Sequence, residues 1–138
     1  MNDRIIYITE FDLHRLEELL EVAGAFTYRG RSDLKELEEE VSRAHVVDSR
    51  EVPPTVVTMN SRVKLLDLDT AEEMVFTLVF PREADIDRSM ISVITPVGTA
   101  ILGYAEGDTI ELKVPSGKRR IKIEKLLYQP EAAGDYHL

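Results

Sequence analysis

Ser49-Arg50-Glu51-Val52-Pro53-Pro54 is the stretch at which the chain changes character. Before it, apolar residues recur every three or four positions, which is the spacing of a helix; after it, they alternate along the chain, as they do in strands. Two successive prolines cannot continue a helix and favour an extended connection. The sequence therefore predicts a boundary here, with a helical unit over residues 1–52 and a sheet-containing unit over residues 53–138.

The helical unit contains two short apolar seams of the coiled-coil kind. The first seam consists of Leu13, Leu16, Leu20 and Ala23, and the second of Leu34, Leu37, Val41 and Ala44. Thr9, followed three residues later by Asp12, predicts the start of the first helix. We expect an antiparallel hairpin of two helices, each of about 12–14 residues, with its tip between Gly24 and Ser32. Because isolated helices of this length are marginal in water, the hairpin is expected to lean on the second unit.

The second unit is predicted to be an antiparallel sheet with one short helix, so the fold class is α+β. A strand over residues 74–80 is apolar on both faces and is expected to lie inside the sheet. Further strands are predicted at residues 91–94, 110–114 and from 121 onward, where the alternation slips near Lys125 and indicates a bulge. The short helix is placed within residues 96–103. Whether the apolar run Ile5–Ile8 joins the sheet as an edge strand stays open.

The composition excludes several kinds of site. The chain has 138 residues, a formal net charge of −9 and no cysteine, so disulfides, zinc–thiolate centres and cysteine nucleophiles are excluded. The acidic balance argues against binding of free nucleic acid and of an anionic membrane surface. The N-terminal apolar run is too short for a targeting core, and the expected location is cytoplasmic. A monomer is the expected oligomeric state.

No catalytic motif is present. Ser116-Gly117-Lys118 lacks the earlier glycine of a phosphate-binding loop and indicates a hairpin turn instead. If the two apolar seams face one another, His45 lies near Asp12, but two potential ligands without a third favour an ion pair over a metal site. The sequence therefore predicts no catalytic residue, no metal and no cofactor.

The predicted hairpin tip differs in charge from the rest of its unit. Residues 1–52 contain seven basic and thirteen acidic residues, yet the tip carries two aromatic residues and two arginines near a single acid: Phe26, Tyr28, Arg29, Arg31 and Asp33. Tyrosine and arginine together are common at protein interfaces, and arginine also binds phosphate. The alternative is that Phe26 caps the seam and the arginines only solvate a loop. Both interpretations stay open.

Residues 57–128 resemble the C-terminal domain of the Gre transcript-cleavage factors. The resemblance rests on four phrases in the same order and spacing: Asn60-Ser61-Arg62-Val63, Met90-Ile91-Ser92-Val93-Ile94-Thr95-Pro96-Val97, Ala100-Ile101-Leu102-Gly103, and Gly107-Asp108 before a strand. The stretches Val57-Thr58-Met59-Asn60-Ser61-Arg62-Val63 and Tyr128-Gln129-Pro130-Glu131-Ala132-Ala133-Gly134-Asp135-Tyr136 are similar, more particularly, to the Rnk branch of Gre-like proteins, the regulators of nucleoside diphosphate kinase.

The resemblance implies an FKBP-like fold for the second unit and RNA polymerase as the partner. In the family, this domain binds at the rim of the polymerase secondary channel, and the loop and short helix around a Ser-Pro motif make the contact. Thr95-Pro96 stands at that place here, so the implied contact residues are Ser92, Thr95, Pro96 and Val97. The alternative interpretation is structural, since a proline at a strand-to-helix junction also serves as a first-turn residue.

The chain departs from the cleavage factors at the hairpin tip. Those factors deliver a pair of acidic residues from a long coiled coil, whereas this tip offers Arg29, Arg31 and Asp33 on a shorter hairpin. A carboxylate assists such chemistry only when it lies within bonding distance of the metal ion or the attacking water. The implied function is therefore that of a polymerase-binding regulator without transcript cleavage. The alternatives are a peptidyl-prolyl isomerase and a direct regulator of nucleoside diphosphate kinase.

Overall fold

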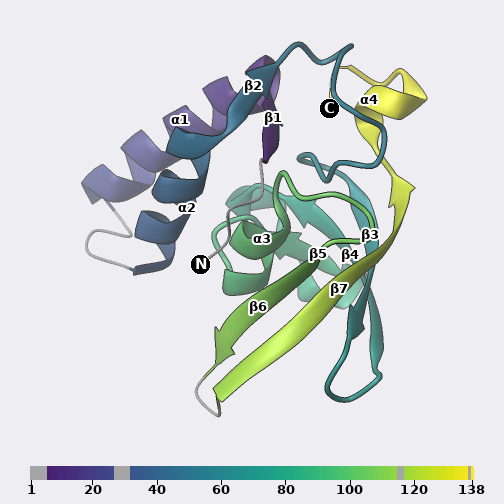
Figure 1. Ribbon diagram of the computed structural model, residues 1–138. Helices are drawn as coiled ribbons and strands as arrows, with labels where there is room; N and C mark the ends of the chain where they lie inside the picture. Colours follow the sequence, from purple (N-terminus) through teal and green to yellow (C-terminus); the bar gives the residue numbers. More distant parts are fainter. Residues whose placement is uncertain (1–5, 27–31, 115–116, 137) are drawn as a thin grey trace.

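The computed structural model describes residues 6–26, 32–114, 117–136 and 138, and its side chains exclude those of residues 22–26, 32–36 and 113–114. The predicted hairpin is present, with helices α1 (Glu10–Phe26) and α2 (Ser32–Arg43). Figure 1 shows this hairpin beside a curled sheet, with the short helix α3 (Pro96–Ile101) in contact with both α2 and the sheet. Helix α1 has 17 residues and is longer than expected, whereas α2 has 12.

Two short strands join the base of the hairpin. β1 (Tyr7–Thr9) pairs in parallel with β2 (His45–Val47), and the two form a separate two-stranded sheet. The open question about Ile5–Ile8 is thereby answered for the described part of that run, because Tyr7 and Ile8 pair with the segment after α2 rather than with the large sheet.

The large sheet has five strands in the order β5-β4-β3-β7-β6. They are β3 (Arg62–Asp67), β4 (Glu73–Val79), β5 (Met90–Ser92), β6 (Thr109–Val114) and β7 (Gly117–Tyr128). Strand β4 has a neighbour on each side, as its two apolar faces predict. The pairing of β3 with β7 shifts register twice, opposite Glu124 and Leu127, which confirms the bulge expected near Lys125.

Two expectations about this unit were wrong in detail. The sheet is not fully antiparallel, because β5 pairs in parallel with β4. The connection over residues 80–89 folds into two 3-10 turns and returns the chain to a position beside β4, where Met90 lies opposite Thr77. A second short helix, α4 (Pro130–Ala133), follows β7; Pro130 occupies its first turn, and the side chain of Gln129 accepts a hydrogen bond from Ala132 N at its start.

The hairpin and the sheet share one hydrophobic core. Leu16 and Leu37, from the two helices, are fully buried in the same cluster as Val63, Leu65 and Ile123 of the sheet. The expectation that the hairpin leans on the second unit is thus confirmed. Within the described residues, no helix is long and apolar enough to cross a membrane.

Candidate functional site

The junction between β5 and α3 contains the four residues that the sequence singled out. Thr95 is the N-cap of α3: its hydroxyl accepts a hydrogen bond from Gly98 N at 3.1 Å and donates one to Ser92 O at 2.7 Å. Pro96 occupies the first turn of the helix, as the structural interpretation of this motif predicts. The Thr-Pro pair therefore builds the junction, whatever else it contacts.

Close packing fixes α3 against the strand. A Cβ atom added at Gly98 would lie 2.3 Å from Ser92 O and 2.9 Å from the Cα of Val93, so only glycine fits between the helix and β5. The hydroxyl of Thr99 donates to Val93 O at 2.7 Å. Because helix and strand are held at this distance, the corner formed by Thr95 and Pro96 has one defined position.

The four residues differ in their access to a partner. Pro96 is exposed, Thr95 and Val97 are half-buried, and Ser92 is buried. Ser92 uses its carbonyl and its hydroxyl internally, since the carbonyl accepts from Thr95 and the hydroxyl accepts from Ile94 N at 3.3 Å. Pro96 with the accessible parts of Thr95 and Val97 can therefore touch another protein, whereas Ser92 positions them.

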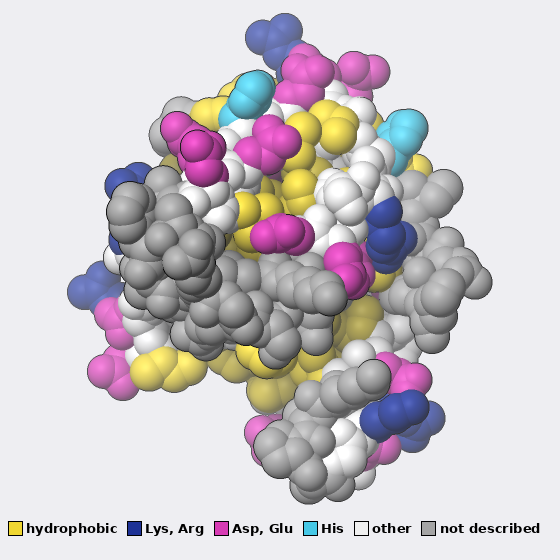
Figure 2. All heavy atoms as spheres, turned by 90° about the vertical axis from the view of Figure 1, so that its left-hand side faces the viewer, with side chains coloured by type: hydrophobic (Ala, Val, Ile, Leu, Met, Phe, Trp, Pro, Cys, Tyr) yellow, Lys and Arg dark blue, Asp and Glu magenta, His cyan; other side chains and the backbone are white. Residues whose placement is uncertain are grey.

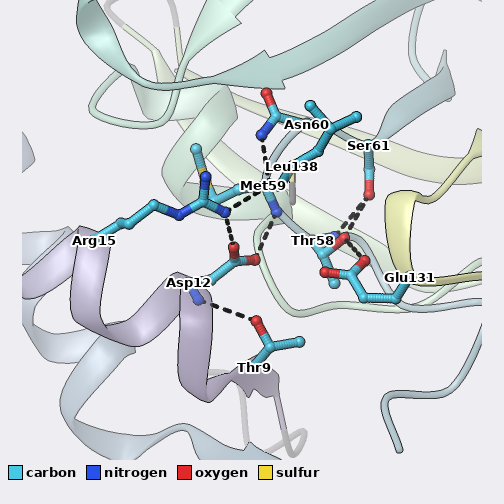
Figure 3. A network of polar contacts seen from close by, with 9 residues as sticks. All are labelled: Thr9, Asp12, Arg15, Thr58, Met59, Asn60, Ser61, Glu131 and Leu138. Atoms are coloured by element: carbon cyan, nitrogen blue, oxygen red, sulfur yellow. Dashed lines mark hydrogen bonds and ion pairs between the residues drawn. The ribbon is translucent and has the colours of Figure 1, made fainter. Parts of the chain in front are cut away.

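A second polar site joins the hairpin to the sheet unit (Figure 3). Asp12 lies in the first turn of α1 and is 1% exposed. Its Oδ1 accepts a hydrogen bond from the Arg15 guanidinium, and its Oδ2 accepts one from Met59 N at 3.0 Å. The carboxylate thus connects the start of the hairpin to the segment that leads into β3.

Arg15 extends this network to the C-terminus. Its Nη2 also donates to Leu138 O at 2.7 Å, and the same oxygen accepts from the side-chain amide of Asn60 at 3.0 Å. The guanidinium lies 4.0 Å from the ring centroid of Phe11 and 4.9 Å from that of Phe80. A planar cation between two aromatic rings is well placed for cation–π attraction, so Arg15 is held by contacts from three parts of the chain.

The residues on either side of Met59, Thr58 and Ser61, anchor the C-terminal helix α4. The hydroxyl of Thr58 donates to Oε1 of Glu131 at 2.7 Å, and Ser61 Oγ lies 2.9 Å from the same hydroxyl. Thr58, Ser61 and Glu131 are all buried. One short segment, residues 58–61, therefore contacts the hairpin on one side and α4 on the other, as Figure 3 shows.

Burial dominates the electrostatics of this network. It raises the pKa of Asp12 from 3.8 to about 6, and the hydrogen bonds from Met59 N and Arg15 only partly oppose that rise. The charged form of Asp12 is therefore disfavoured in the folded protein relative to the unfolded chain, even though it is paired.

The expected pairing of Asp12 with His45 is wrong. The ring of His45 instead packs edge-on against Tyr7, with centroids 5.5 Å apart, and Asp12 faces Arg15 and Met59. The capping motif that drew attention to Asp12 is half confirmed, since Asp12 N donates to the hydroxyl of Thr9 at 3.1 Å. The sequence offered no signal for the long-range partners of this carboxylate.

The structure gives no placement for the side chains of the hairpin tip. Tyr28, Arg29 and Arg31 lie outside the described residues, and Phe26 and Asp33 are described only as backbone, at the end of α1 and near the start of α2. The predictions for these five residues therefore stay predictions. Over the described part of the chain, no group of three or more His, Asp or Glu residues could hold a metal ion.

Two family models match separate stretches of the chain. The family model "Transcription elongation factor, GreA/GreB, C-term" matches residues 52–128, and the model "Rnk N-terminus" matches residues 4–47. The chain is 40% identical over 139 residues to the regulator of nucleoside diphosphate kinase of Escherichia coli K12, with full coverage of both chains. It is 35% identical to the transcription elongation factor GreA of Sulfurovum sp., covering 89% of this chain and 77% of that protein.

A solved structure of similar fold supports the same assignment. The transcription elongation factor GreA/GreB from Nitrosomonas europaea superposes with a TM-score of 0.72 at 46% identity, covering 89% of this chain and 99% of the other. The match covers nearly the whole of both chains, so the two proteins are similar in the hairpin as well as in the sheet unit.

Proposed function

Because the chain belongs to the GreA/GreB transcription elongation factor family and carries the N-terminal unit of its Rnk branch, we propose that it regulates transcription by binding RNA polymerase at the rim of the secondary channel. The corner of Thr95, Pro96 and Val97 makes the contact, with Ser92 positioning it. The single observation that carries the proposal is that Pro96 lies exposed at a rigidly held helix start, at the place of the family motif.

The short hairpin determines what the bound protein does. An α2 of 12 residues is about 18 Å long at the rise of an α-helix, and its tip sequence offers Arg29, Arg31 and a single acid, Asp33. The hairpin points into the channel and occupies it without delivering an acidic pair to the catalytic metal. The protein therefore excludes Gre-type factors from the polymerase and does not stimulate transcript cleavage.

The remaining expectations belong to the same proposal. Residues 1–52 and 53–138 are two units that cooperate in binding, and the second has an FKBP-like fold without isomerase activity, because a fold does not fix a function. The protein acts as a cytoplasmic monomer with no metal or cofactor, and it binds polymerase rather than free nucleic acid, since its net charge of −9 opposes binding to phosphates.

Substitution at the exposed proline tests the contact. Pro96→Glu places an acid in the first helical turn, where α-helices tolerate it, so the fold is expected to persist. Its matched control is Pro54→Glu, at another exposed proline, in the connection between the units. We expect the affinity for purified core RNA polymerase to fall by about tenfold or more for Pro96→Glu and to stay unchanged for the control. Equal affinities for both variants would remove α3 from the contact.

A transcript-cleavage assay tests the regulatory part. Stalled, backtracked elongation complexes incubated with the protein are expected to keep their full-length RNA, and prior addition of the protein is expected to slow cleavage stimulated by a Gre factor. Shortening of the RNA that disappears in Asp33→Ala would show that this chain is itself a cleavage factor.

The name of the relative from Escherichia coli, regulator of nucleoside diphosphate kinase, favours a second candidate function, direct regulation of such a kinase. Purified kinase assayed with and without the protein separates the two functions. A change in kinase rate in the absence of polymerase would support the direct role, and an unchanged rate would leave transcription as the route.

A further inference from the structure

An open groove of about 390 Å³ runs between the two helices of the hairpin and strand β2. It is lined by Leu13, Glu17 and Leu20 of α1, by Glu38, Val41 and Ser42 of α2, and by Ala44 and Val46 beyond it. Figure 2 looks onto this side of the molecule, where apolar side chains lie among carboxylates. The groove is separate from the α3 corner that the proposed function uses.

The floor of the groove is apolar and only partly covered. Leu13, Leu20 and Ala44 pack against the core from one side but keep exposed surface, and Val46 is 41% exposed. Leu16 and Leu37, which belong to the same two seams, are buried completely. The two seams of the hairpin are therefore fully buried where they meet the sheet unit and remain partly exposed along the groove, where apolar side chains of a partner can pack against them.

The walls of the groove are acidic. Glu17 stands on the α1 side and Glu38 on the α2 side, and none of the lining residues that the structure describes is basic. The two helices together contain ten acidic and three basic residues. The field over the groove is therefore negative and attracts a cationic ligand.

This charge excludes two possible occupants. Phosphate groups of a nucleic acid would face Glu17 and Glu38 and be repelled. A second copy of the chain packed symmetrically would bring the same carboxylates opposite one another, because a two-fold interface places one patch against itself. A ligand that carries both apolar groups and positive charges can pack against the apolar floor and pair with the acidic walls.

From this arrangement we propose that the groove binds an amphipathic segment of a partner protein, with apolar side chains on the floor and Lys or Arg beside Glu17 and Glu38. An amphipathic helix laid into an apolar groove is a common mode of peptide recognition. The groove is a second docking surface, beyond the contact proposed for α3, and gives the short hairpin a binding role of its own.

A designed peptide tests the proposal directly. The probe is a helix-forming peptide of about 14 residues with leucines on one face and lysines on the other, titrated against the full chain. The variant Glu17→Lys/Glu38→Lys reverses both walls. Its control, Glu18→Lys/Glu39→Lys, makes the same change in charge on the same helices, at exposed positions that do not line the groove. We expect the first variant to bind the probe about tenfold more weakly than the control. Equal binding by the two variants would overturn the proposal.

A second pair of variants tests the apolar floor. Val46→Ser is compared with Leu127→Ser, because the two side chains are 41% and 44% exposed and only Val46 lines the groove. The probe is expected to lose affinity for Val46→Ser alone. Equal loss in both variants would contradict the proposal. So would self-association of the wild-type chain, seen by sedimentation, that Glu17→Lys/Glu38→Lys abolishes, because the groove would then be an interface between copies.

Discussion

The α3 junction and the base of the hairpin are both held by hydrogen bonds, but they are assembled in opposite ways. At the junction, the bonds of Thr95 and Thr99 join residues that are three to six positions apart. At the hairpin base, Asp12 reaches Met59 across 47 positions and Arg15 reaches Leu138 across 123. The first site is a local structure that its own sequence specifies, and the second exists only when the whole chain is folded.

This difference separates two roles. The α3 corner is held by bonds and packing to the neighbouring strand β5 and presents Pro96 there, whereas the network around Asp12 fixes where the hairpin sits relative to the sheet. A buried ion pair adds little net stability, because removing its charges from water offsets their attraction. We therefore interpret the network around Asp12 as fixing the orientation of the hairpin. The following substitutions compare the importance of this network with that of the α3 junction.

Arg15→Met is expected to have the largest effect. It removes the cation that pairs with Asp12, the donor to Leu138 O and the group between Phe11 and Phe80. A buried carboxylate that loses its partner costs about 4 kcal/mol of unfolding free energy. Chemical denaturation measures the loss, with the exposed Arg82→Met as control, which we expect to stay within about 0.5 kcal/mol of the wild type. Equal stability of the two variants would show that the base network is dispensable.

Gly98→Ala is expected to do comparable damage at the junction. The added methyl group would lie 2.3 Å from Ser92 O, so α3 must move away from β5, at a cost of about 3 kcal/mol. Gly107→Ala is the control: it adds a methyl group with nothing within 4 Å, at a backbone φ of +95°. Thermal unfolding is expected to show a loss of only about 1 kcal/mol there, from backbone strain alone. Equal losses would mean that the contact between helix and strand is looser than the distances indicate.

The pH dependence of Asp12→Asn reports on the hairpin base alone. The pKa of Asp12 is raised by burial from 3.8 to about 6, so the folded protein binds a proton that the unfolded chain has released. The contribution of this group to stability is therefore complete below about pH 4 and is lost as the pH rises to about 6. The unfolding free energy of the wild type minus that of the variant is expected to fall by at most about 3 kcal/mol across this window. A difference that rises or stays flat would contradict the raised pKa.

Thr95→Ala is expected to have the smallest effect on stability. It removes the N-cap of a short helix, which costs about 1 kcal/mol, whereas Thr95→Ser keeps the hydroxyl and most of that stability. The informative result is the comparison with polymerase binding. If the hydroxyl only caps the helix, the affinity for polymerase is expected to change in step with the free energy of unfolding in both variants. Loss of affinity in Thr95→Ser at unchanged stability would assign the methyl group to the interface.

The same contrast explains which features of the fold could be predicted from the sequence. Four features depend on residues that are close together in the sequence, and the structure contains all of them. They are the helical spacing of apolar residues, the cap at Thr9, the helix start at Thr95-Pro96 and the bulge near Lys125. The parallel pairing of β5 with β4 could not be predicted, because it depends on how the turns over residues 80–89 return the chain. Helix α4 was missed even though Pro130 and Gly134 mark its start and end.

The candidate sites also differ in whether neighbouring residues in the sequence reveal them. Ser92, Thr95, Pro96 and Val97 were found through a family resemblance carried by contiguous residues. Asp12 was noticed only as part of a helix cap, because neither Met59 nor Leu138 is marked by a pattern that would pair it with the start of α1. The groove beside Val46 was not foreseen either, since the sequence gives the apolar seams of the two helices but not which of their surfaces the sheet leaves open.

Displacement of a Gre factor tests the central claim most directly. A fluorescently labelled, cleavage-active Gre factor is bound to purified core RNA polymerase, and the unlabelled chain is titrated into the complex. The account predicts that the label is released to completion, at a midpoint that rises in proportion to the concentration of labelled factor, and that Pro96→Glu releases it poorly. Binding of the chain to polymerase that leaves the Gre factor in place, or no binding to polymerase at all, would contradict the account.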